Sequence, residues 1–537
     1  MILAPQTTCD AIPTNDEAQE IKQFFDKGLV VQLDNSLDKS GLVKSVLLDG
    51  IDGLPEEIMS EIFLCCLPRN HYPVISWDEP PLLLTRVSRG WKRVALGTPR
   101  LWTSVHVPWP VLPDPDPLRA NLPSNVHPFV CQRLLEAMGM WLDRSASLPL
   151  NISLVNFHHP NRAQSLLQNA IVLPSARLTT LTVCGTTEFL HSVASLRLEA
   201  VPVLESLSMK GLDITIDLDV TRFDSSLFIG PQLRTLEFEK ISLDAVRLPV
   251  NWLKLTHLTL LCGRHVPSFA SLTIRNITTI LRLARNLISC KFEIYPSILG
   301  TDEPSTLFSS GIYLVNLERL SIQDHNVDLT QFFDVLHVPS LERIEFNSDA
   351  TLMSPEISMA SIKSLVERVG SQIKSFTSDL NNFSESDFAQ ILQFCPNISA
   401  ISITPSASGS QDSDGALSMF YAAAGMTRAR SIVNDDIFRV LISGTSEGTF
   451  LAPNLTDLRL LQAAHFSELA LSGFLEQKQT MGGAMQKLRY LEVRFLTKQR
   501  SSLELKLGRF QQDGLDFKLW YPLVIPAAPL NHAAGVD

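Results

Sequence analysis

The sequence has few cysteines and no long apolar run. Eight cysteines occur among 537 residues, and no two of them form a CxxC pair. This number is too small for a disulfide scaffold, and the spacing gives no zinc or thioredoxin-like motif. No stretch approaches the roughly 20 apolar residues of a membrane span, and the first residues lack the pattern of a secretory signal. We therefore expect an intracellular protein, cytoplasmic or nuclear, with no membrane partner.

A strong excess of charge is also missing. Lys and Arg number 45 against 56 Asp and Glu, so the formal net charge is −11. Nucleic acids and anionic membranes require a basic face, so this balance disfavours both as partners. Hydrophobic residues make up 45% of the chain and charged residues 19%. That composition excludes a mostly disordered chain and indicates a large core.

Motifs for catalysis are weak. Cys65–Cys66 lies in an apolar segment and is expected to supply core thiols. His106 and the pair His158–His159 have no partners at metal-ligand spacing, and the glycine-rich segment 444–448 lacks the lysine of a phosphate loop. We expect no catalytic residue, no metal and no cofactor, hence no enzyme. A ligase that uses its own cysteine ranks last, because no cysteine has a neighbouring acid–base set.

Residues 54–102 predict a compact helical module. Pro55 suits the first turn of a helix, and the two glutamates that follow suit the positive end of its dipole. Ile58 and Ile62 recur at i, i+4 on this helix. A second helix is predicted from Leu83, Val87, Trp91 and Val94, which share one helical face. Seven prolines between 108 and 128 then indicate a stiff, extended linker.

The rest of the chain repeats. After a helix over 129–145 and a first strand near Leu150–Leu154, the spacing apolar-x-x-apolar-x-apolar recurs eleven times between 178 and 493. Successive repeats begin 22 to 33 residues apart, except for one interval of 57 that holds an insertion near 405–428. A single repeat cannot cover its own apolar rows, so the repeats are expected to stack into a parallel sheet with a continuous core.

Charged side chains alternate with the apolar positions of these strands. Alternation places them on the face of the sheet opposite the core. Mixed charge on that face suits binding of a protein substrate, whereas the alternative is that it only keeps the face soluble. The candidate substrate-binding residues are Glu237, Glu239, Lys291, Glu293, Arg319, Arg343, Glu345, Asp457, Arg459, Glu492 and Arg494, with Lys210 and Asp379 in the same pattern.

Two motifs carry a resemblance. The segment LPEEIMSEIFLCCLP, followed by LLLTRVSRGWKRVALGTPRLW, resembles an F-box. The repeats resemble a degenerate, ribonuclease-inhibitor-like leucine-rich-repeat array. Together they resemble the expanded F-box families of mushroom-forming fungi. The fold class implied is α/β, with a small all-helical F-box before a solenoid that has a curved parallel sheet.

The implied organisation has five parts. These are a partly helical N-terminal extension over 1–50, the F-box over 51–105, the Pro-rich linker over 106–128, the helix and repeat array over 129–500, and a C-terminal cap and tail over 501–537.

The resemblance also implies a function. F-box proteins of this kind are substrate-recognition subunits of SCF-type cullin–RING ubiquitin ligases, which bind a Skp-type adaptor and through it a cullin. The residues that match adaptor-facing positions are Leu54, Pro55, Ile58, Ile62, Phe63, Val87 and Trp91. Two alternatives remain open: these residues are only the module's own core, or the chain is a leucine-rich-repeat scaffold that is not coupled to ubiquitylation.

Overall fold

The computed structural model describes sixteen segments of the chain. They are 54–108, 126–156, 171–196, 201–211, 226–241, 244–261, 272–296, 308–325, 327–348, 355–380, 383–405, 434–444, 450–464, 466–480, 485–495 and 503–521. The predicted N-terminal extension, most of the predicted linker and almost all of the predicted insertion lie outside them. The chain divides into two compact units, one made of Met1–Ile241 with Leu248–Asn251 and the other of Ser242–Arg247 with Trp252–Asp537.

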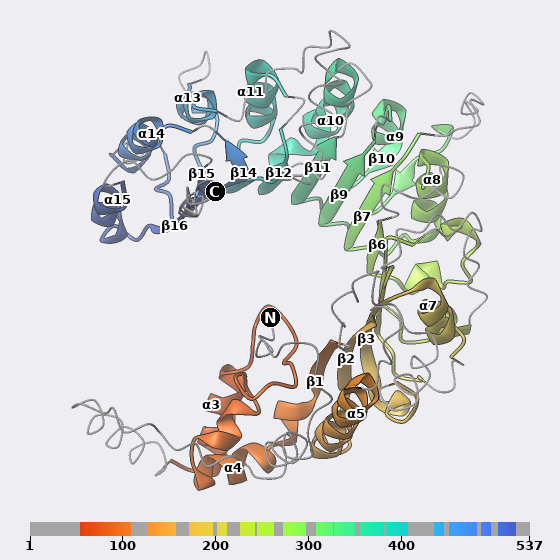
Figure 1. The fold of residues 1–537 in the computed structure, drawn as a ribbon. Helices are drawn as coiled ribbons and strands as arrows, with labels where there is room; N and C mark the ends of the chain where they lie inside the picture. The colour runs from red at the N-terminus through yellow and green to blue at the C-terminus, as the bar shows by residue number, and fades with distance from the viewer. Residues whose placement is uncertain are drawn as a thin grey trace, which may run out of the picture. The chain divides into compact units, whose positions relative to one another are not determined.

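The first unit opens with the helical module, residues 54–102 (Figure 1). Its elements are α3 (Glu56–Cys65), η1 (Leu83–Arg86), α4 (Arg89–Leu96) and η2 (Pro99–Trp102). The prediction of one second helix is wrong. The hydroxyl of Ser88 accepts a hydrogen bond from the backbone N–H of Trp91 at 3.1 Å. Ser88 is thus the N-cap of α4, which begins as a separate helix after η1. Leu83 and Val87 therefore precede α4.

The strands of the first unit are parallel and follow chain order. They are β1 (Ser104–Pro108), β2 (Leu150–Asn156), β3 (Leu178–Gly185), β4 (Ser206–Gly211) and β5 (Thr235–Glu239). Between them lie α5 (Val126–Arg144), η5 (Ser175–Arg177), α7 (Thr187–Ala194) and η7 (Ser226–Ile229).

The boundaries of the predicted linker, 106–128, are wrong at both ends. β1 pairs with β2 and buries Val105 and Val107, so the sheet begins directly after the helical module. At the other end, α5 begins at Val126 rather than near 129.

The second unit continues the same pattern. Its parallel strands are β6 (His257–Leu261), β7 (Ser289–Ile294), β9 (Arg319–Asp324), β11 (Arg343–Ser348), β12 (Ser375–Ser378), β13 (Ala400–Ile403), β14 (Asp457–Ala464), β15 (Tyr490–Phe495) and β16 (Asp516–Trp520). Two short strands, β8 (Ile312–Tyr313) and β10 (Leu336–His337), pair separately. Each of the eleven predicted repeats in the whole chain supplies one strand of this kind.

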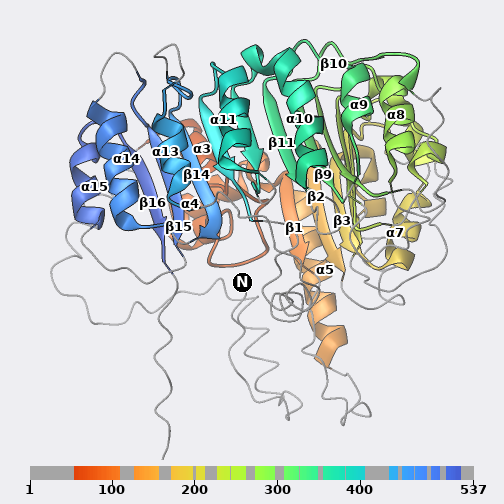
Figure 2. The same ribbon diagram turned by 90° about the horizontal axis from the view of Figure 1, so that it is seen from above.

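Helices of the second unit cover one face of its sheet, and Figure 2 shows α8 to α11 side by side. They are α8 (Ile274–Leu283), α9 (Thr330–Val335), α10 (Pro355–Val369), α11 (Glu385–Phe394), α13 (Asp436–Ile442), α14 (Glu468–Thr480) and α15 (Leu503–Gln511), with the short turns η8 (Ala245–Arg247), η9 (Trp252–Lys254) and η12 (Gly370–Gln372). Apolar rows of the strands face these helices: Leu320, Ile344 and Phe376 are register partners, each at most 3% exposed.

Two boundaries in this unit refine the predictions. β13 pairs directly with β14, so the interval of 57 residues holds one repeat with an insertion and not two repeats. The sheet also extends past residue 500. β16 pairs with β15, and it belongs to the segment predicted as cap and tail.

Side chains just before the strands tie neighbouring repeats together. The amide of Asn397 donates to the carbonyl of Ser371 at 2.7 Å, and that of Asn454 donates to the carbonyl of Pro396 at 3.0 Å. Asn286 bonds the carbonyl of Leu253 in the same way at 2.7 Å. Each of these asparagines directly precedes the first apolar position of its repeat. Its side chain therefore provides a hydrogen-bond donor for a backbone carbonyl in the turn of the preceding repeat.

Candidate functional site

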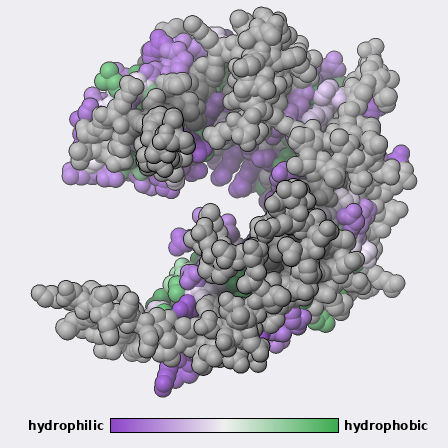
Figure 3. Space-filling view, viewed as in Figure 1, coloured by the Kyte–Doolittle hydropathy of each residue, from purple (hydrophilic) through white to green (hydrophobic). Residues whose placement is uncertain are grey.

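Apolar side chains are concentrated on the surface of the helical module. Of the fifteen large hydrophobic side chains that are exposed in the described part of the chain, five belong to it. Figure 3 shows hydrophobic surface in the region of α3. We call these residues the apolar surface of the module: Leu54 (38% exposed), Ile58 (50%), Ile62 (39%), Leu83 (38%) and Val87 (41%). Four of the five were predicted adaptor-binding residues, and Pro55, a fifth predicted residue, is exposed beside them.

The module also has a complete core of its own. Met59 and Phe63 of α3 are buried, and the Phe63 ring lies 4.9 Å from that of Trp91. Trp102 is fully buried and donates its indole N–H to the carbonyl of Ala95 at 2.9 Å. Phe63 is thus a core residue that offers no surface to a partner, and Trp91 is half-buried. The five side chains of the apolar surface remain exposed, because the core of the module is complete without them.

Polar contacts hold α3 against α4 and η2. Arg93 pairs with Glu56 at 2.7 Å, and Arg100 pairs with Glu61 at 2.6 Å. The hydroxyls of Ser60 and Thr98 lie 2.9 Å apart. Exposed ion pairs contribute little stability individually, but these contacts together hold α3, which carries Ile58 and Ile62 of the apolar surface, against α4 and η2.

The module is joined rigidly to the first repeats. The rings of Trp102 and Trp141 meet edge to face with centroids 4.9 Å apart, and the Arg144 guanidinium lies 4.6 Å from the Trp102 ring centroid. The backbone N–H of His106 on β1 donates to the carbonyl of Pro73 at 2.8 Å, and its ring nitrogen lies 2.9 Å from the Ser153 hydroxyl. Burial lowers the pKa of His106, so its imidazole is a neutral structural partner.

The sheet face away from the helices, which we call the open face, carries the predicted charged residues. Ten of the eleven candidate substrate-binding residues are exposed or half-buried there, as alternation predicts. Glu293 is the exception, at 5% exposed. Its carboxylate accepts from the Tyr295 hydroxyl at 2.7 Å and lies 2.9 Å from a ring nitrogen of His325. Tyr295 stacks on His325 with ring centroids 4.3 Å apart, so this carboxylate is closed off.

Some charges on the open face are compensated within the sheet. In the first unit, Lys210 lies 3.4 Å from Glu237 and 2.9 Å from Glu239. In the second unit, Lys291 pairs with Glu345 at 3.2 Å. Lys210 and Glu239 are register partners on adjacent strands. Lys291 instead reaches Glu345 across Ser321 of the intervening strand β9.

The end of the sheet carries an ordered aromatic cluster. Glu492 accepts from the hydroxyl of Tyr490 at 2.8 Å and from the indole N–H of Trp520 at 3.1 Å. Arg459 lies over the Tyr490 ring, 5.0 Å from its centroid. Tyr490 and Trp520 were not predicted as site residues. The sequence marked this cluster only through Glu492, the charged residue to which both aromatic side chains donate a hydrogen bond.

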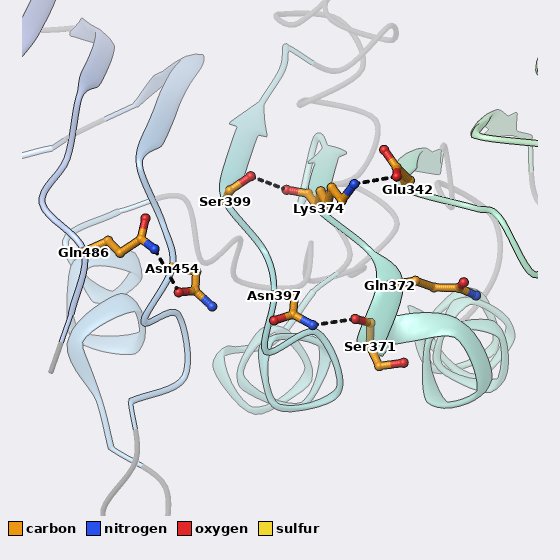
Figure 4. Close-up of a pocket in the computed structure, with 8 residues that line it drawn as sticks. All are labelled: Glu342, Ser371, Gln372, Lys374, Asn397, Ser399, Asn454 and Gln486. Carbon is orange, nitrogen blue, oxygen red and sulfur yellow. Dashed lines mark hydrogen bonds and ion pairs between the residues drawn. The ribbon is translucent and has the colours of Figure 1, made fainter.

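A shallow polar pocket of about 600 Å³ lies at the amino-terminal ends of β12 to β15 (Figure 4). Its polar groups already bind one another: Lys374 pairs with Glu342, and the amide of Gln486 donates to Asn454 at 3.3 Å. The pocket is therefore part of the contacts between repeats. Its lining residues are Glu342, Ser371, Gln372, Lys374, Asn397, Ser399, Asn454 and Gln486.

Burial raises the pKa of four thiols in the described part of the chain, those of Cys66, Cys184, Cys290 and Cys395. Burial raises the pKa of Cys395 to about 12 and raises that of Cys290 further. The expectation that Cys65 and Cys66 are core thiols is wrong, since both are exposed. Partial burial and the neighbouring Cys65 still raise the pKa of Cys66.

Two other kinds of site are absent from the described residues. Within the sixteen segments, no group of three or more His, Cys, Asp and Glu side chains is placed to hold a metal ion. No helix in those segments is long and apolar enough to cross a membrane. His158–His159 and all but the first residue of segment 444–448 lie outside them.

Comparison of the chain with models of known protein families gives no match, and a search of curated proteins gives none either.

Proposed function

We propose that this protein is the substrate-recognition subunit of an SCF-type cullin–RING ubiquitin ligase. The observation that carries this proposal is the apolar surface of the helical module. It remains exposed although the module has filled its own core with Met59, Phe63 and Trp102. A cluster of large apolar side chains beside a filled core is the composition of a protein-binding surface. The F-box resemblance of the same residues supports a Skp-type adaptor as the partner.

The junction with the repeats supports a receptor that holds its cargo at a fixed position. Trp102, Trp141 and Arg144 lock the module to the first strands of its unit, and β1 continues into the sheet without a flexible hinge. In this proposal the chain performs no chemistry itself. It raises the effective concentration of a protein substrate, bound on the open face, near a ubiquitin-charged partner.

The test is reconstitution with purified components. The full chain is mixed with a Skp-type adaptor and then with a cullin, and complexes are detected by size-exclusion chromatography with light scattering. We expect a stoichiometric complex with the adaptor and a larger one with the cullin. A correctly folded chain that binds no adaptor refutes the proposal. Binding of the adaptor without the cullin favours a repeat scaffold that is not coupled to ubiquitylation.

A further inference from the structure

The two end strands of the parallel sheet differ in what lies along their outer edge. At β1, the backbone N–H of His106 donates to the carbonyl of Pro73 at 2.8 Å, and Val74 forms a parallel bridge with the same strand. β16 pairs with β15 on one side, and among the described residues no strand pairs with its other side. Figure 1 shows β16 at the end of the strand series of the second unit. Its outer edge is therefore a row of backbone donors and acceptors that a further strand could join.

Alternate residues of β16 direct their peptide groups to opposite sides of the strand. The backbone N–H of Asp516 donates to the carbonyl of Arg489 at 2.8 Å, on the side of β15. Because successive residues of a strand alternate in this direction, the N–H and C=O groups of Phe517 and Leu519 point to the outer edge. These two residues supply the backbone groups that a partner strand would bind.

The apolar side chains of β16 are also incompletely covered. Phe517 and Leu519 are half-buried, whereas their register partners on β15, Leu491 and Val493, are fully buried. An inner strand is covered by a neighbour on each side, and β16 has a described neighbour on one side. Solenoids usually end in a repeat with a polar outer face. An apolar row that stays half-exposed at this position indicates a surface that another strand covers.

The charged side chains of β16 are complementary to each other. Asp516 and Lys518 are both exposed, and neither forms an ion pair with a described residue. Lys518 stands beside Glu492 in the register, but the two oxygens of that carboxylate accept hydrogen bonds from Tyr490 and Trp520. A lysine on an edge strand ordinarily keeps sheets apart. Here an aspartate two residues earlier can neutralise it when two such strands pair antiparallel.

We propose that the outer edge of β16 pairs antiparallel with the same edge of a second copy of this chain, about a two-fold axis at Phe517. On that axis the two Phe517 residues exchange N–H···O=C hydrogen bonds, using the groups that point outward. Asp516 of each copy then stands opposite Lys518 of the other, in a pair without backbone hydrogen bonds, where side chains are closest. The half-buried rows also meet, since Leu519 of each copy falls opposite Leu515 of the other.

The charges favour this register over the neighbouring one. An axis one residue further along, at Lys518, would place the two lysines side by side and Asp516 opposite Trp520. The axis at Phe517 instead forms two pairs of opposite charge. A second copy thus fits the edge with the same residues on both sides, as a two-fold interface requires. The inference goes beyond the proposed function and does not depend on it, because β16 lies outside the helical module.

The test is the oligomeric state of the full chain, measured by light scattering and analytical ultracentrifugation. The wild type is expected to form a dimer whose fraction rises with concentration. D516K and K518D each convert two attractive pairs into two repulsive ones, because the axis doubles every substitution. Each variant alone is therefore expected to dimerise at least about tenfold more weakly than the wild type.

Two combinations of these variants are expected to restore the dimer. In an equimolar mixture of D516K and K518D, a chain with two lysines faces a chain with two aspartates, and native mass spectrometry should detect the mixed dimer. In the double variant D516K/K518D both pairs are only reversed, so it is expected to dimerise on its own. A dimer that neither combination restores overturns the inference, because the loss would then be damage to the strand.

K506D is the matched control, since Lys506 is exposed on α15 of the same repeat and lies outside β16. It is expected to dimerise as the wild type does, and circular dichroism checks that every variant is folded. A wild type that stays monomeric up to about 100 µM overturns the inference, whatever else covers the edge. A dimer that D516K and K518D leave unchanged overturns the assignment to β16.

A cysteine on the proposed axis tests the register directly. Residues of a hydrogen-bonded antiparallel pair have Cα atoms about 5.5 Å apart, which is within the range of a disulfide. F517C is therefore expected to form a disulfide-linked dimer under mild oxidation. Peptide mapping separates this bond from links through the exposed Cys65 and Cys66, which the wild type shares. A dimer of F517C without a bond at position 517 overturns the register.

Adaptor binding separates this inference from the proposed function. The substitutions in β16 lie outside the helical module, so K518D is expected to bind the adaptor as the wild type does. A chain that dimerises through β16 but binds no adaptor refutes only the ligase assignment. A chain that binds the adaptor but stays monomeric refutes only the pairing of β16 with a second copy.

Discussion

Truncating the apolar surface of the helical module is expected to weaken adaptor binding strongly without unfolding the chain. Ile58, Ile62 and Val87 leave between 39% and 50% of their surface uncovered. Complete burial of such a side chain contributes about 1.5–3 kcal/mol, so a partner that covers the remainder gains roughly 1 kcal/mol from each. The triple variant I58A/I62A/V87A is then expected to bind the adaptor about a hundredfold more weakly.

A neighbouring residue on α3 provides the contrasting variant. Phe63 follows Ile62 directly but is fully buried against Trp91. Phe63→Ala is expected to cost about 3–5 kcal/mol of folding free energy, because it opens a cavity in the module. Titration calorimetry with the purified adaptor measures the first effect, and thermal unfolding followed by circular dichroism measures the second.

Leu469→Ala is the control for removing an exposed apolar side chain, since Leu469 is 80% exposed on α14. It is expected to change neither adaptor affinity nor stability. If the triple variant binds the adaptor as the wild type does, the apolar surface is not the docking site. If it unfolds as Phe63→Ala does, these side chains belong to the core and the reasoning from exposure fails.

Two further predictions concern stability. Lys478 is 1% exposed, and burial lowers its pKa to about 8 from the usual 10.5. The unfolded chain therefore binds this proton more tightly, and the free energy of unfolding should rise between pH 8 and 10.5 in urea titrations. Lys478→Met should abolish that rise and add roughly 2 kcal/mol at neutral pH; an unchanged pH dependence contradicts this. Asn454→Ala should cost about 1 kcal/mol, because it leaves the Pro396 carbonyl unbonded. Asn316 occupies the same repeat position without a side-chain hydrogen bond to any described residue, so Asn316→Ala should cost nothing measurable. Equal losses of stability in the two variants would contradict the stabilising role of the Asn454 hydrogen bond.

The strands of the repeats could be predicted because two sequence periodicities, one within each strand and one between strands, mark the same residues. Alternation within a strand and recurrence between strands both mark residues such as Leu320 and Ile344 as core. The end strands escaped for two different reasons. In β16, Phe517 and Leu519 are merely half-buried, and Gly514 stands where the spacing requires a first apolar residue. β1 has the spacing, as the buried residues Trp102, Val105 and Val107, but the prolines that begin at Pro108 led to the assignment of this segment to a linker.

The candidate sites show where a one-dimensional pattern fails. Apolar spacing cannot separate Ile62 from Phe63, since both fit a helix face and only the position of Trp91 decides which is covered. Glu293 was assigned to the open face by alternation, but His325, 32 residues later in the chain, closes over it. The pairing of Arg319 with Arg343 depends on strand register, which the chain order of the repeats sets and the residue types do not reveal.

The helical module is followed directly by β1, the first strand of the sheet, and this connection affects how precisely a receptor could position its substrate. If the residues after 106 formed a linker that made no contact with the sheet, the position of an adaptor-bound module relative to the first repeats would depend on that linker alone, and any freedom in it would lower the effective concentration of bound substrate. Instead, His106 lies in β1, paired with β2, and Trp102 is packed against Trp141 of the helix that follows. The chain that leaves β1 at Pro108 returns in α5, so whatever lies between 109 and 125 connects two elements already held together. Lengthening that segment should therefore leave the angle between module and first strands unchanged, whereas Trp102→Ala should loosen it.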